Sequence, residues 1–399
     1  MTFPFDQQIR VAVDVGCHRH RVAVAGPENR VLEEFDIEHS AQGIGAFFRR
    51  VEAHERRLEL PVAVAMEGFN GWARPLDTQI LVRGWRLFNV NNLKLARFKE
   101  IFPASAKSDR IDTRKTLELF QLRDHLPMAG DVLQEVMATP EENHILKRLS
   151  RRRRRLVDER GRVINSLQAD VQAVAPGLLQ ITRDVGNLWF LNFLTCRKGL
   201  LKLARVRRAS LLKVPGIGAT YADAIKAWQS RAYFAPDARL VGDMIQQDAA
   251  RILELKQQIK ALEEQMARIA ESSSIAGQLA SIPGYGAICS AELAGEIGTV
   301  ERFRGEASLA LYLGMATLDN SSGKYRGSKA PKHVNARAKA AMMTAVDHHR
   351  KRVSQSQFYY EKKRADGKRH NQAIRALGRH LCRVIFKMLT QERPYWIDP

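Results

Sequence analysis

Cysteine is scarce in this chain, and its spacing excludes two common kinds of stabilised site. The four cysteines among 399 residues are Cys17, Cys196, Cys289 and Cys382, and no two of them form a C-x-x-C pair. Zinc sites and disulfide frameworks both need cysteines at close, regular spacing. The sequence therefore predicts neither kind of site, and it fits a protein kept in a reducing cytoplasm.

Long apolar runs are also missing. No stretch approaches the roughly 20 apolar residues that a membrane-spanning helix requires. The N-terminal segment MTFPFDQQIR does not join a basic region to an apolar one, as a signal peptide does. We therefore expect a protein that has no membrane partner and stays in the cytoplasm.

Acidic residues are outnumbered by basic ones. There are 43 Asp and Glu against 64 Lys and Arg, which gives a formal net charge of +21. Such an excess points to a polyanionic partner, either nucleic acid or an anionic membrane surface. Because the membrane signals are absent, nucleic acid is the better interpretation, and the expected location is the nucleoid. A chain of this length can hold two or three domains.

The N-terminal region has the pattern of a sheet. Residues 9–38 alternate apolar and polar side chains and predict three strands, with PENR as a turn. The order continues with a helix at 41–56, a strand at 60–67, a helix from about 71, a strand at 85–90 and a helix at 108–123. Strands followed by alternating helices and strands predict a mixed α/β sheet covered by helices.

Long helices dominate from about residue 128. In one of them apolar residues recur at steps of three, four and seven: Ile245, Ile252, Leu255, Ile259, Leu262, Met266 and Ile269. This rhythm is typical of a coiled-coil seam, formed within one chain or between two, and a helix buried in its own subunit is the alternative. The expected domains are 1–127, a helical coiled-coil region at 128–272, and a mostly α-helical domain at 273–399.

A run of five arginines lies on a predicted helix at 141–172: Arg151, Arg152, Arg153, Arg154 and Arg155. A solvated helix face is the plain interpretation. Five neighbours point all round a helix, however, and repel one another unless a polyanion is close. We therefore predict that the run contacts RNA or DNA, with an affinity that falls as salt rises.

One short pattern occurs twice. LLKVPGIGATYADAIKAW at 211–228 and LASIPGYGAICSAELAGEI at 279–297 share L-x-x-[VI]-P-G-x-G-A followed by a helical stretch. The pattern resembles half of a helix-hairpin-helix, whose turn offers backbone N–H groups to a phosphate. A tight glycine turn between packed helices is the alternative, and the sequence leaves both open.

Four carboxylates are placed where a metal site would need them. Asp14 lies in the apolar strand VAVDVG, where an unpartnered charge is costly, and Glu67 ends the strand VAVAME. Asp109 and Asp112 share one face of a helix start, for which ordinary capping is the alternative. Together these oxygens predict a site for one or two Mg²⁺ ions, suited to phosphodiester displacement. The basic neighbours expected to contact DNA are Arg110, Arg114 and Lys115.

On this order of strands and helices, the four carboxylates resemble the DEDD tetrad of RNase H-like, RuvC-like insertion-sequence transposases. KSDRIDTRK is similar to the family's K(T/S)D-x-x-D-A-x, with Thr113 in place of a small residue. LALYLGMATLDNSSGKYRG resembles the GLxPxxxxSSG segment of the family's C-terminal transposase domain. The resemblance runs in order from about residue 9 to residue 390.

The second segment places Ser322 at the position of the family's nucleophilic serine, with Ser321 as the alternative. Two positions depart from the family pattern, because Thr317 stands where proline is usual and Val334 where glycine is usual. Taken without the family, NSSG is an ordinary turn. The basic residues expected to neutralise DNA phosphates around the serine are Lys324, Arg326, Lys329 and Lys332.

The resemblance implies a RuvC-like N-terminal domain and a DNA recombinase of the bridge-RNA-guided group, which includes the pilin-gene invertase. It implies Mg²⁺ as cofactor, donor and target DNA as substrates, a structured guide RNA as partner, and assembly as a dimer or tetramer. Two alternatives stay open. One is a RuvC-like nuclease or junction resolvase without a covalent intermediate, and the other is a non-catalytic nucleic-acid scaffold.

Overall fold

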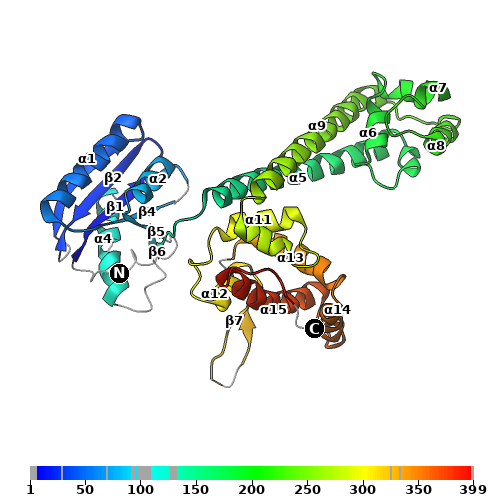
Figure 1. The fold of residues 1–399 in the computed structure, drawn as a ribbon. Helices are drawn as coiled ribbons and strands as arrows, with labels where there is room; N and C mark the ends of the chain where they lie inside the picture. Colours follow the sequence, from blue (N-terminus) through cyan, green and yellow to red (C-terminus); the bar gives the residue numbers. More distant parts are fainter. Residues whose placement is uncertain are drawn as a thin grey trace. The chain divides into compact units, whose positions relative to one another are not determined.

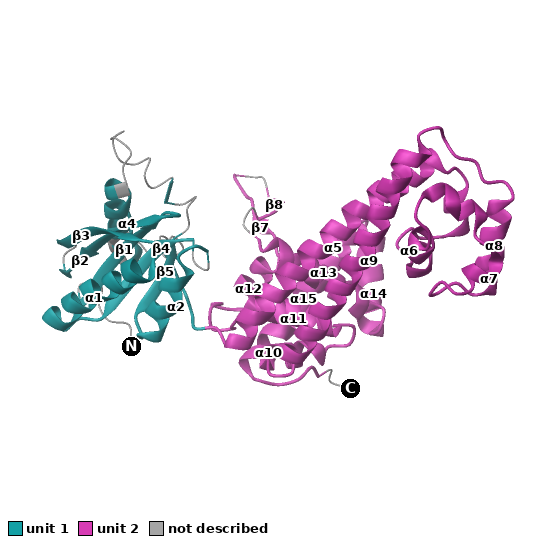
Figure 2. Cartoon of the chain, turned by 90° about the horizontal axis from the view of Figure 1, so that it is seen from above, with its two compact units in different colours: residues 1–138 teal, residues 139–399 magenta. Residues whose placement is uncertain are grey.

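The computed structural model describes residues 7–27, 30–68, 71–90, 95–96, 109–125, 133–323, 326–331 and 334–396. The chain divides into two compact units, residues 1–138 and 139–399 (Figure 2). The boundary expected at 127 lies near the junction of these units, and the one expected at 272 lies inside the second unit. The three-part division stays a prediction.

The first unit is built on a mixed six-stranded sheet in the order β3-β2-β1-β4-β5-β6. Its strands are β1 (Ile9–Val15), β2 (Arg19–Ala25), β3 (Val31–Glu38), β4 (Val62–Glu67), β5 (Arg86–Val90) and β6 (Leu133–Glu135). Strands β1, β4 and β5 run parallel to one another, and each of the other strands is antiparallel to its neighbour. The predicted mixed sheet and its first five strands are confirmed.

The two faces of this sheet carry different side chains. Large apolar residues such as Val11, Val64 and Met66 form one core with the helices α1 (Ala41–Leu58) and α2 (Arg74–Val82). The alternate positions are mostly alanines, and they pack against α4 (Asp109–His125). Because strand side chains alternate between faces, small residues on one face let α4 lie close to the sheet. This face also receives Asp14 and Glu67.

The second unit contains a long helical pair, α5 (Glu141–Val174) and α9 (Ala238–Ala270), which lie side by side in Figure 1. The predicted apolar stripe of α9 packs on α5 within the same chain. Met266 joins Leu146, Ile259 joins Leu156, and the stripe continues past Leu167 to Val174, so the helices run antiparallel. A two-helix seam inside the chain is thus present, and coiled-coil geometry stays a prediction.

Between these two helices the chain forms a small helical subdomain. Its elements are η4 (Leu178–Ile181), α6 (Leu188–Thr195), η5 (Leu200–Arg205), α7 (Arg208–Leu211) and α8 (Ala219–Gln229). Phe190, Phe193 and Trp228 are buried in its core. Aromatic side chains of this size remove a large apolar area from water, which lets short helices form a stable core.

The rest of the second unit is mostly helical, as predicted. Its elements are α10 (Ser274–Ala280), α11 (Ala287–Ile297), α12 (Glu306–Tyr312), β7 (Leu318–Asp319), β8 (Ser328–Lys329), α13 (Ala336–Arg350), α14 (Ser354–Ala365) and α15 (His370–Thr390). A core of buried residues from α11, α12, α13 and α15 holds these helices together. Across the described ranges, no helix is both long and apolar enough to span a membrane.

The duplicated PGxGA pattern forms the same turn twice. Gly216 and Gly284 both have positive φ, +83° and +90°, between α7 and α8 and between α10 and α11. A Cβ at Gly284 would lie 2.5 Å from the backbone nitrogen of His349, so this turn needs glycine both for its φ and for its close packing on α13. The tight-turn interpretation is sufficient for both copies, and phosphate binding stays a prediction.

Candidate active site

Asp14 and Glu67 lie side by side at the carboxyl end of the sheet. Their strands are parallel neighbours, and the register pairs Val13 with Met66, so these two acidic residues come next on each strand. Asp14 lies on the same sheet face as Ala12, and Glu67 lies on the same face as Ala65. Both alanines pack against α4, so both carboxylates are on the face that α4 covers. Both side chains are half-buried. The structure therefore brings the two predicted strand carboxylates together.

The start of α4 lies on that same face. Thr113, Thr116, Leu117 and Phe120 are buried and form the stripe that packs on the sheet. Asp112 precedes Thr116 by four residues, so it extends the stripe toward the start of the helix and is half-buried there. Asp109, the first residue of α4, precedes Thr113 by the same interval, and its side chain lies outside the described residues.

Three arginines contact the carboxylate of Glu34, a residue of β3, beside the start of α4. Its carboxylate accepts hydrogen bonds from Arg110 Nε at 2.7 Å and Arg114 Nε at 2.5 Å, and Arg21 lies 3.6 Å away. The Glu34 side chain is only 10% exposed. Hydrogen bonding and charge from Arg114, joined by Arg110, hold the pKa of Glu34 below its usual value. The first turn of α4 is thereby tied to the sheet.

These contacts change the interpretation of two basic neighbours of the tetrad. Arg110 and Arg114 were expected to bind the DNA backbone, but each forms an ion pair with Glu34 within the protein. Both side chains remain about half exposed, 59% and 46%, so their outer N–H groups can still meet solvent or an anion. Their first role is structural, and sequence reasoning missed it because Glu34 is distant in sequence.

The four candidate side chains are all carboxylates, the type of ligand that a hard divalent cation prefers. Asp14, Glu67 and Asp112 supply carboxylate oxygens on one sheet face, which is the chemistry that Mg²⁺ selects. Among the described side chains, which do not include that of Asp109, no three acidic, histidine or cysteine residues gather closely enough to hold a metal ion. The three described carboxylates alone do not complete such a site.

Ser322 lies on an exposed hairpin of the second unit, built from β7 and β8. Leu318 pairs with Lys329, Asp319 pairs with Ser328, and the Asn320 amide donates to the Gly327 carbonyl at 2.9 Å. Ser321 and Ser322 are both exposed, and neither hydroxyl has a hydrogen-bond partner among the described residues. Lys324 and Lys332 lie outside the described residues, whereas Arg326 and Lys329 are exposed on the hairpin.

The two ends of this hairpin are joined by a partly buried polar network. Asn335 caps α13 and donates from Nδ2 to Glu296 Oε2 at 2.7 Å and to the Tyr312 hydroxyl at 2.7 Å. The Tyr312 hydroxyl in turn donates to the Glu296 carbonyl at 2.7 Å. Tyr312 ends the helix before the hairpin, and Asn335 begins the helix after it. The hairpin therefore projects from a fixed base.

Glu296 is the centre of that base. Its side chain is fully buried, and Arg151 of α5 also binds it through two hydrogen bonds. Burial alone would raise the pKa of Glu296, but the hydrogen bonds from Arg151 and Asn335 outweigh it and the pKa lies below its usual value. Burial lowers the pKa of nearby Lys147 to about 8.

Three of the five arginines in the run form ion pairs within the protein, and the other two are exposed. Arg151 pairs with Glu296, Arg153 pairs with Glu263 at 2.7 Å, and Arg154 pairs with Glu292 at 3.1 Å. Carboxylates inside the protein therefore offset much of the run's charge, so the argument that a polyanion must do so is wrong. Arg152 and Arg155 are exposed and have no ion-pair partner in the described ranges. Nucleic-acid contact by all five stays a prediction.

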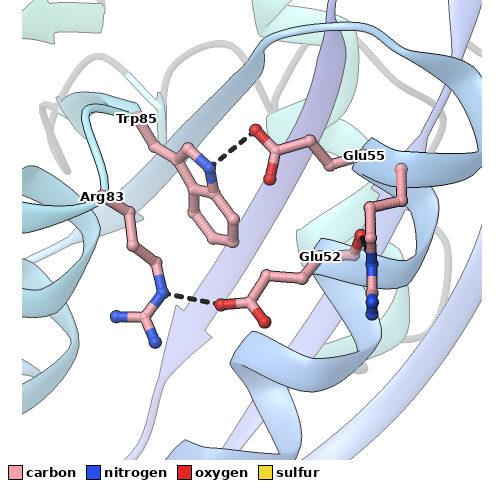
Figure 3. Close-up of a pocket in the computed structure, with 5 residues that line it drawn as sticks. Glu52, Glu55, Arg83 and Trp85 are labelled. Carbon is pink, nitrogen blue, oxygen red and sulfur yellow. Dashed lines mark hydrogen bonds and ion pairs between the residues drawn. The ribbon is translucent and has the colours of Figure 1, made fainter.

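A separate polar pocket of about 320 Å³ lies at the opposite end of the sheet (Figure 3). Arg83 donates to Glu52 at 2.8 Å, and the Trp85 indole N–H donates to Glu55 at 3.0 Å. Trp85 immediately precedes β5, so this pocket is at the amino end of the parallel strands, away from Asp14 and Glu67. Its carboxylates already have partners, and we assign it no role in the candidate site.

Two family models match the chain in the regions that carry the candidate residues. One, described as "Transposase" and named for the DEDD transposases of IS110, matches residues 11–176, which contain all four tetrad carboxylates. The other, described as "Transposase IS116/IS110/IS902 family", matches residues 276–361, which contain Ser322.

Full-length relatives agree with these matches. The chain is 24% identical over 392 residues to the insertion element IS110 uncharacterized 43.6 kDa protein of Streptomyces coelicolor, covering 96% of this chain and 94% of that one. It is also 24% identical over 402 residues to the insertion element IS116 uncharacterized 44.8 kDa protein of Streptomyces clavuligerus, covering 98% and 97%. A protein of insertion element IS900 from Mycobacterium paratuberculosis is 29% identical over 177 residues, covering 44% of each chain.

Proposed function

The chain belongs to the IS116/IS110/IS902 family of DEDD transposases, and from that premise we propose how it cuts and rejoins DNA. Asp14, Glu67, Asp109 and Asp112 would form the metal-binding half of the active site, and Ser322 would be the nucleophile. The observation that carries the first half is the shared sheet face of Asp14, Glu67 and the start of α4.

The four carboxylates would hold one or two Mg²⁺ ions, which when bound stabilise charge on a phosphate under attack. This chain's part is to present the oxygens from rigid elements. Asp14 and Glu67 are fixed by strand pairing, and Asp112 is fixed by the helix that Glu34 ties down. An RNase H-like assignment of this unit is supported by the strand order and by these positions.

Ser322 would form the covalent bond to DNA. Its hydroxyl loses a proton as its oxygen bonds to phosphorus, the bond from phosphorus to the leaving deoxyribose oxygen breaks, and that oxygen takes up a proton. A strand hydroxyl from the partner site then attacks the same phosphorus and releases the serine. The phosphodiester energy is conserved through the intermediate, so the strands can be rejoined.

The active site would be composite. The tetrad lies in the first unit and Ser322 in the second, on a hairpin where no described group activates its hydroxyl. We propose that the metal-binding half activates the serine, supplied by the same chain or by another copy in a dimer or tetramer. A structured RNA guide is proposed as the partner that chooses donor and target DNA, with Arg152 and Arg155 as exposed cationic contacts.

Covalent capture tests this proposal. The protein would be incubated with Mg²⁺, RNA transcribed from the noncoding DNA that flanks its gene, and labelled donor DNA, and then separated on a denaturing gel. We expect a protein–DNA adduct that is lost in Ser322→Ala and in Asp14→Ala and kept in Ser321→Ala. Cleavage without an adduct that survives Ser322→Ala would instead identify a metal-dependent nuclease.

A further inference from the structure

A hollow of about 500 Å³ lies in the second unit between the foot of the serine hairpin and the last two long helices. Thr317 and Ser328 line it from the hairpin. Lys368, Arg375 and Arg379 line it from α15 and the residues just before it. The hollow therefore joins the element that carries Ser322 to a basic helix surface.

The hollow has an excess of positive charge. Lys368 and Arg375 form no ion pair in the described part of the chain, although Lys363, which pairs with Asp366, and the nearby charge of Lys368 both lower the pKa of that carboxyl. Arg379 shares a single carboxylate, Glu306, with Arg383, at 3.1 and 3.2 Å. Cations that converge on one concave surface raise the local concentration of anions. The charge of this surface thus favours an anionic ligand.

Arg379 has a hydrogen-bond donor left over. Its Nη2 donates to Glu306, whereas its Nη1 is buried and has no acceptor among the described residues. The Arg379 side chain as a whole is 27% exposed and lines the hollow, so its charge acts on a ligand there even though Nη1 itself does not reach the open space. Gln372, in the first turn of α15, also lines the hollow, and the start of a helix of this length favours negative charge.

The neighbouring histidine does not add to this charge at neutral pH. His380 lines the same hollow and shares a hydrogen bond with the Tyr359 hydroxyl at 3.0 Å. Burial, followed by the charges of Arg383 and Arg379, lowers the pKa of His380 below its usual value. Protonated imidazole is thus disfavoured near pH 7, and the positive charge of the hollow comes from the arginines and the lysine.

We propose that this hollow binds a backbone phosphate of the DNA strand that reaches Ser322. The inference rests on the proposed function, because it takes Ser322 as the residue that meets DNA. Thr317 is five residues from Ser322, and an extended chain of that length spans about 17 Å at most. In a duplex this distance corresponds to about five phosphate steps along one strand. One bound strand can therefore occupy both places.

Such a contact would set the register of the DNA on the hairpin. A phosphate held at Arg375 and Arg379 fixes the strand at one point, and the hairpin that carries Ser322 begins beside that point. Phosphate contacts of this kind position a nucleic acid without recognising its sequence. DNA is the expected ligand because the hollow borders the hairpin of the strand-cutting serine.

The test compares two pairs of variants in a DNA-binding titration. Arg375→Gln and Arg379→Gln remove charge from the hollow. Lys387→Gln removes a charge from the same helix outside the hollow, and Arg383→Gln removes the other partner of Glu306. Full-length protein would be titrated against labelled duplex DNA from the end of the element over a range of salt concentrations. Helical circular dichroism and melting temperature would establish that each variant is folded.

We expect the slope of log affinity against log salt to become shallower by about one for each hollow variant and to stay unchanged for the two controls. Equal slopes for all five proteins, or an equal change in the controls, would overturn the proposal. So would a change seen only with the flanking RNA as probe, because the hollow would then serve RNA. Ser322→Ala should bind DNA with the wild-type slope, so loss of the covalent adduct and loss of this phosphate contact are separate outcomes.

Discussion

Arg151 holds the buried carboxylate of Glu296 in a two-point contact, from Nε to Oε1 at 2.7 Å and from Nη2 to Oε2 at 2.9 Å. The pair links the arginine run on α5 to α11, and Asn335 extends the link to the helix that follows the serine hairpin. A charge this deeply buried is tolerated because its lone pairs are occupied. Removing either partner should therefore be costly.

We expect Glu296→Gln to destabilise the second unit by about 3 kcal/mol, since the buried guanidinium contact and the Asn335 contact both lose their charged acceptor. Thermal and urea unfolding followed by helical circular dichroism would measure the change. Glu263→Gln is the matched control. The Glu263 side chain is 32% exposed, so its ion pair with Arg153 should contribute less than about 1 kcal/mol to stability. Equal losses in the two variants would contradict a special role for Glu296.

Lys147 should give the second unit an unusual alkaline pH dependence. Its pKa is about 8 in the folded protein, against an ordinary value of 10.5. Between these values the unfolded chain keeps a proton that the folded chain has released, so this group makes folding more favourable as pH rises. Below pH 8 its charge is destabilising.

Lys147→Met should therefore raise stability at pH 7 by about 2 kcal/mol, after allowance for the contact of Lys147 with water. The difference between variant and wild type should shrink as pH approaches 10.5. Urea unfolding at several pH values would measure it. A difference that is constant with pH would show that Lys147 acts through packing alone.

The close approach of α5 and α11 depends on Gly295. A Cβ at this position would lie 2.4 Å from the Lys147 backbone nitrogen, which cannot move without displacing the helix. Gly295→Ala should cost about 1–3 kcal/mol through overpacking. Gly161→Ala, at a site on α5 with no atom within 4 Å of its Cβ, should instead stabilise by up to about 1 kcal/mol. Opposite signs in the melting temperatures would confirm both expectations.

Local periodicity was enough to predict most of the fold. A repeat of apolar residues within a short segment predicted the three strands of 9–38, the strand β4 and the apolar stripe of α9. Each of these elements forms as expected. Strand β6 has three residues, Leu133–Glu135, which is too short for any periodic signal. It forms because it pairs with β5, which is a tertiary contact.

The candidate site could be predicted only where its residues share a local motif. Asp109 and Asp112 lie in one heptapeptide, whereas Arg151 and Glu296 are 145 residues apart, so no local pattern indicated that the run was partly neutralised. Glu34 was missed for the same reason, since it is 80 residues from Arg114. The two arginines of the hollow could have been found, because Arg375 and Arg379 lie four residues apart and so share one helix face.

Glu34 should act as a positioning residue for the tetrad. In Glu34→Gln the first turn of α4 loses the charged acceptor of Arg110 and Arg114. We expect the Mg²⁺ concentration for half-maximal adduct formation to rise several-fold, because Asp112 is held less firmly. Asp36→Asn is the control, since the Asp36 side chain that pairs with Arg21 at 3.3 Å is more exposed than that of Glu34. A lower melting temperature with unchanged Mg²⁺ dependence would limit Glu34 to a structural role.

The arginine run should separate into a structural part and a nucleic-acid part. Arg151 and Arg154 are engaged by the buried carboxylates Glu296 and Glu292, so Arg151→Gln and Arg154→Gln should lower the melting temperature. Arg152 and Arg155 are exposed, so Arg152→Gln and Arg155→Gln should leave stability within about 0.5 kcal/mol of wild type.

The second pair should instead weaken binding of the flanking RNA and make its salt dependence shallower by about one for each phosphate that the variant no longer neutralises. Thermal unfolding and RNA titration of the same four variants would measure both properties. If Arg152→Gln and Arg155→Gln bind RNA and DNA as the wild type does, the run is a structural element. Its charge would then be explained by the carboxylates of α9 and α11.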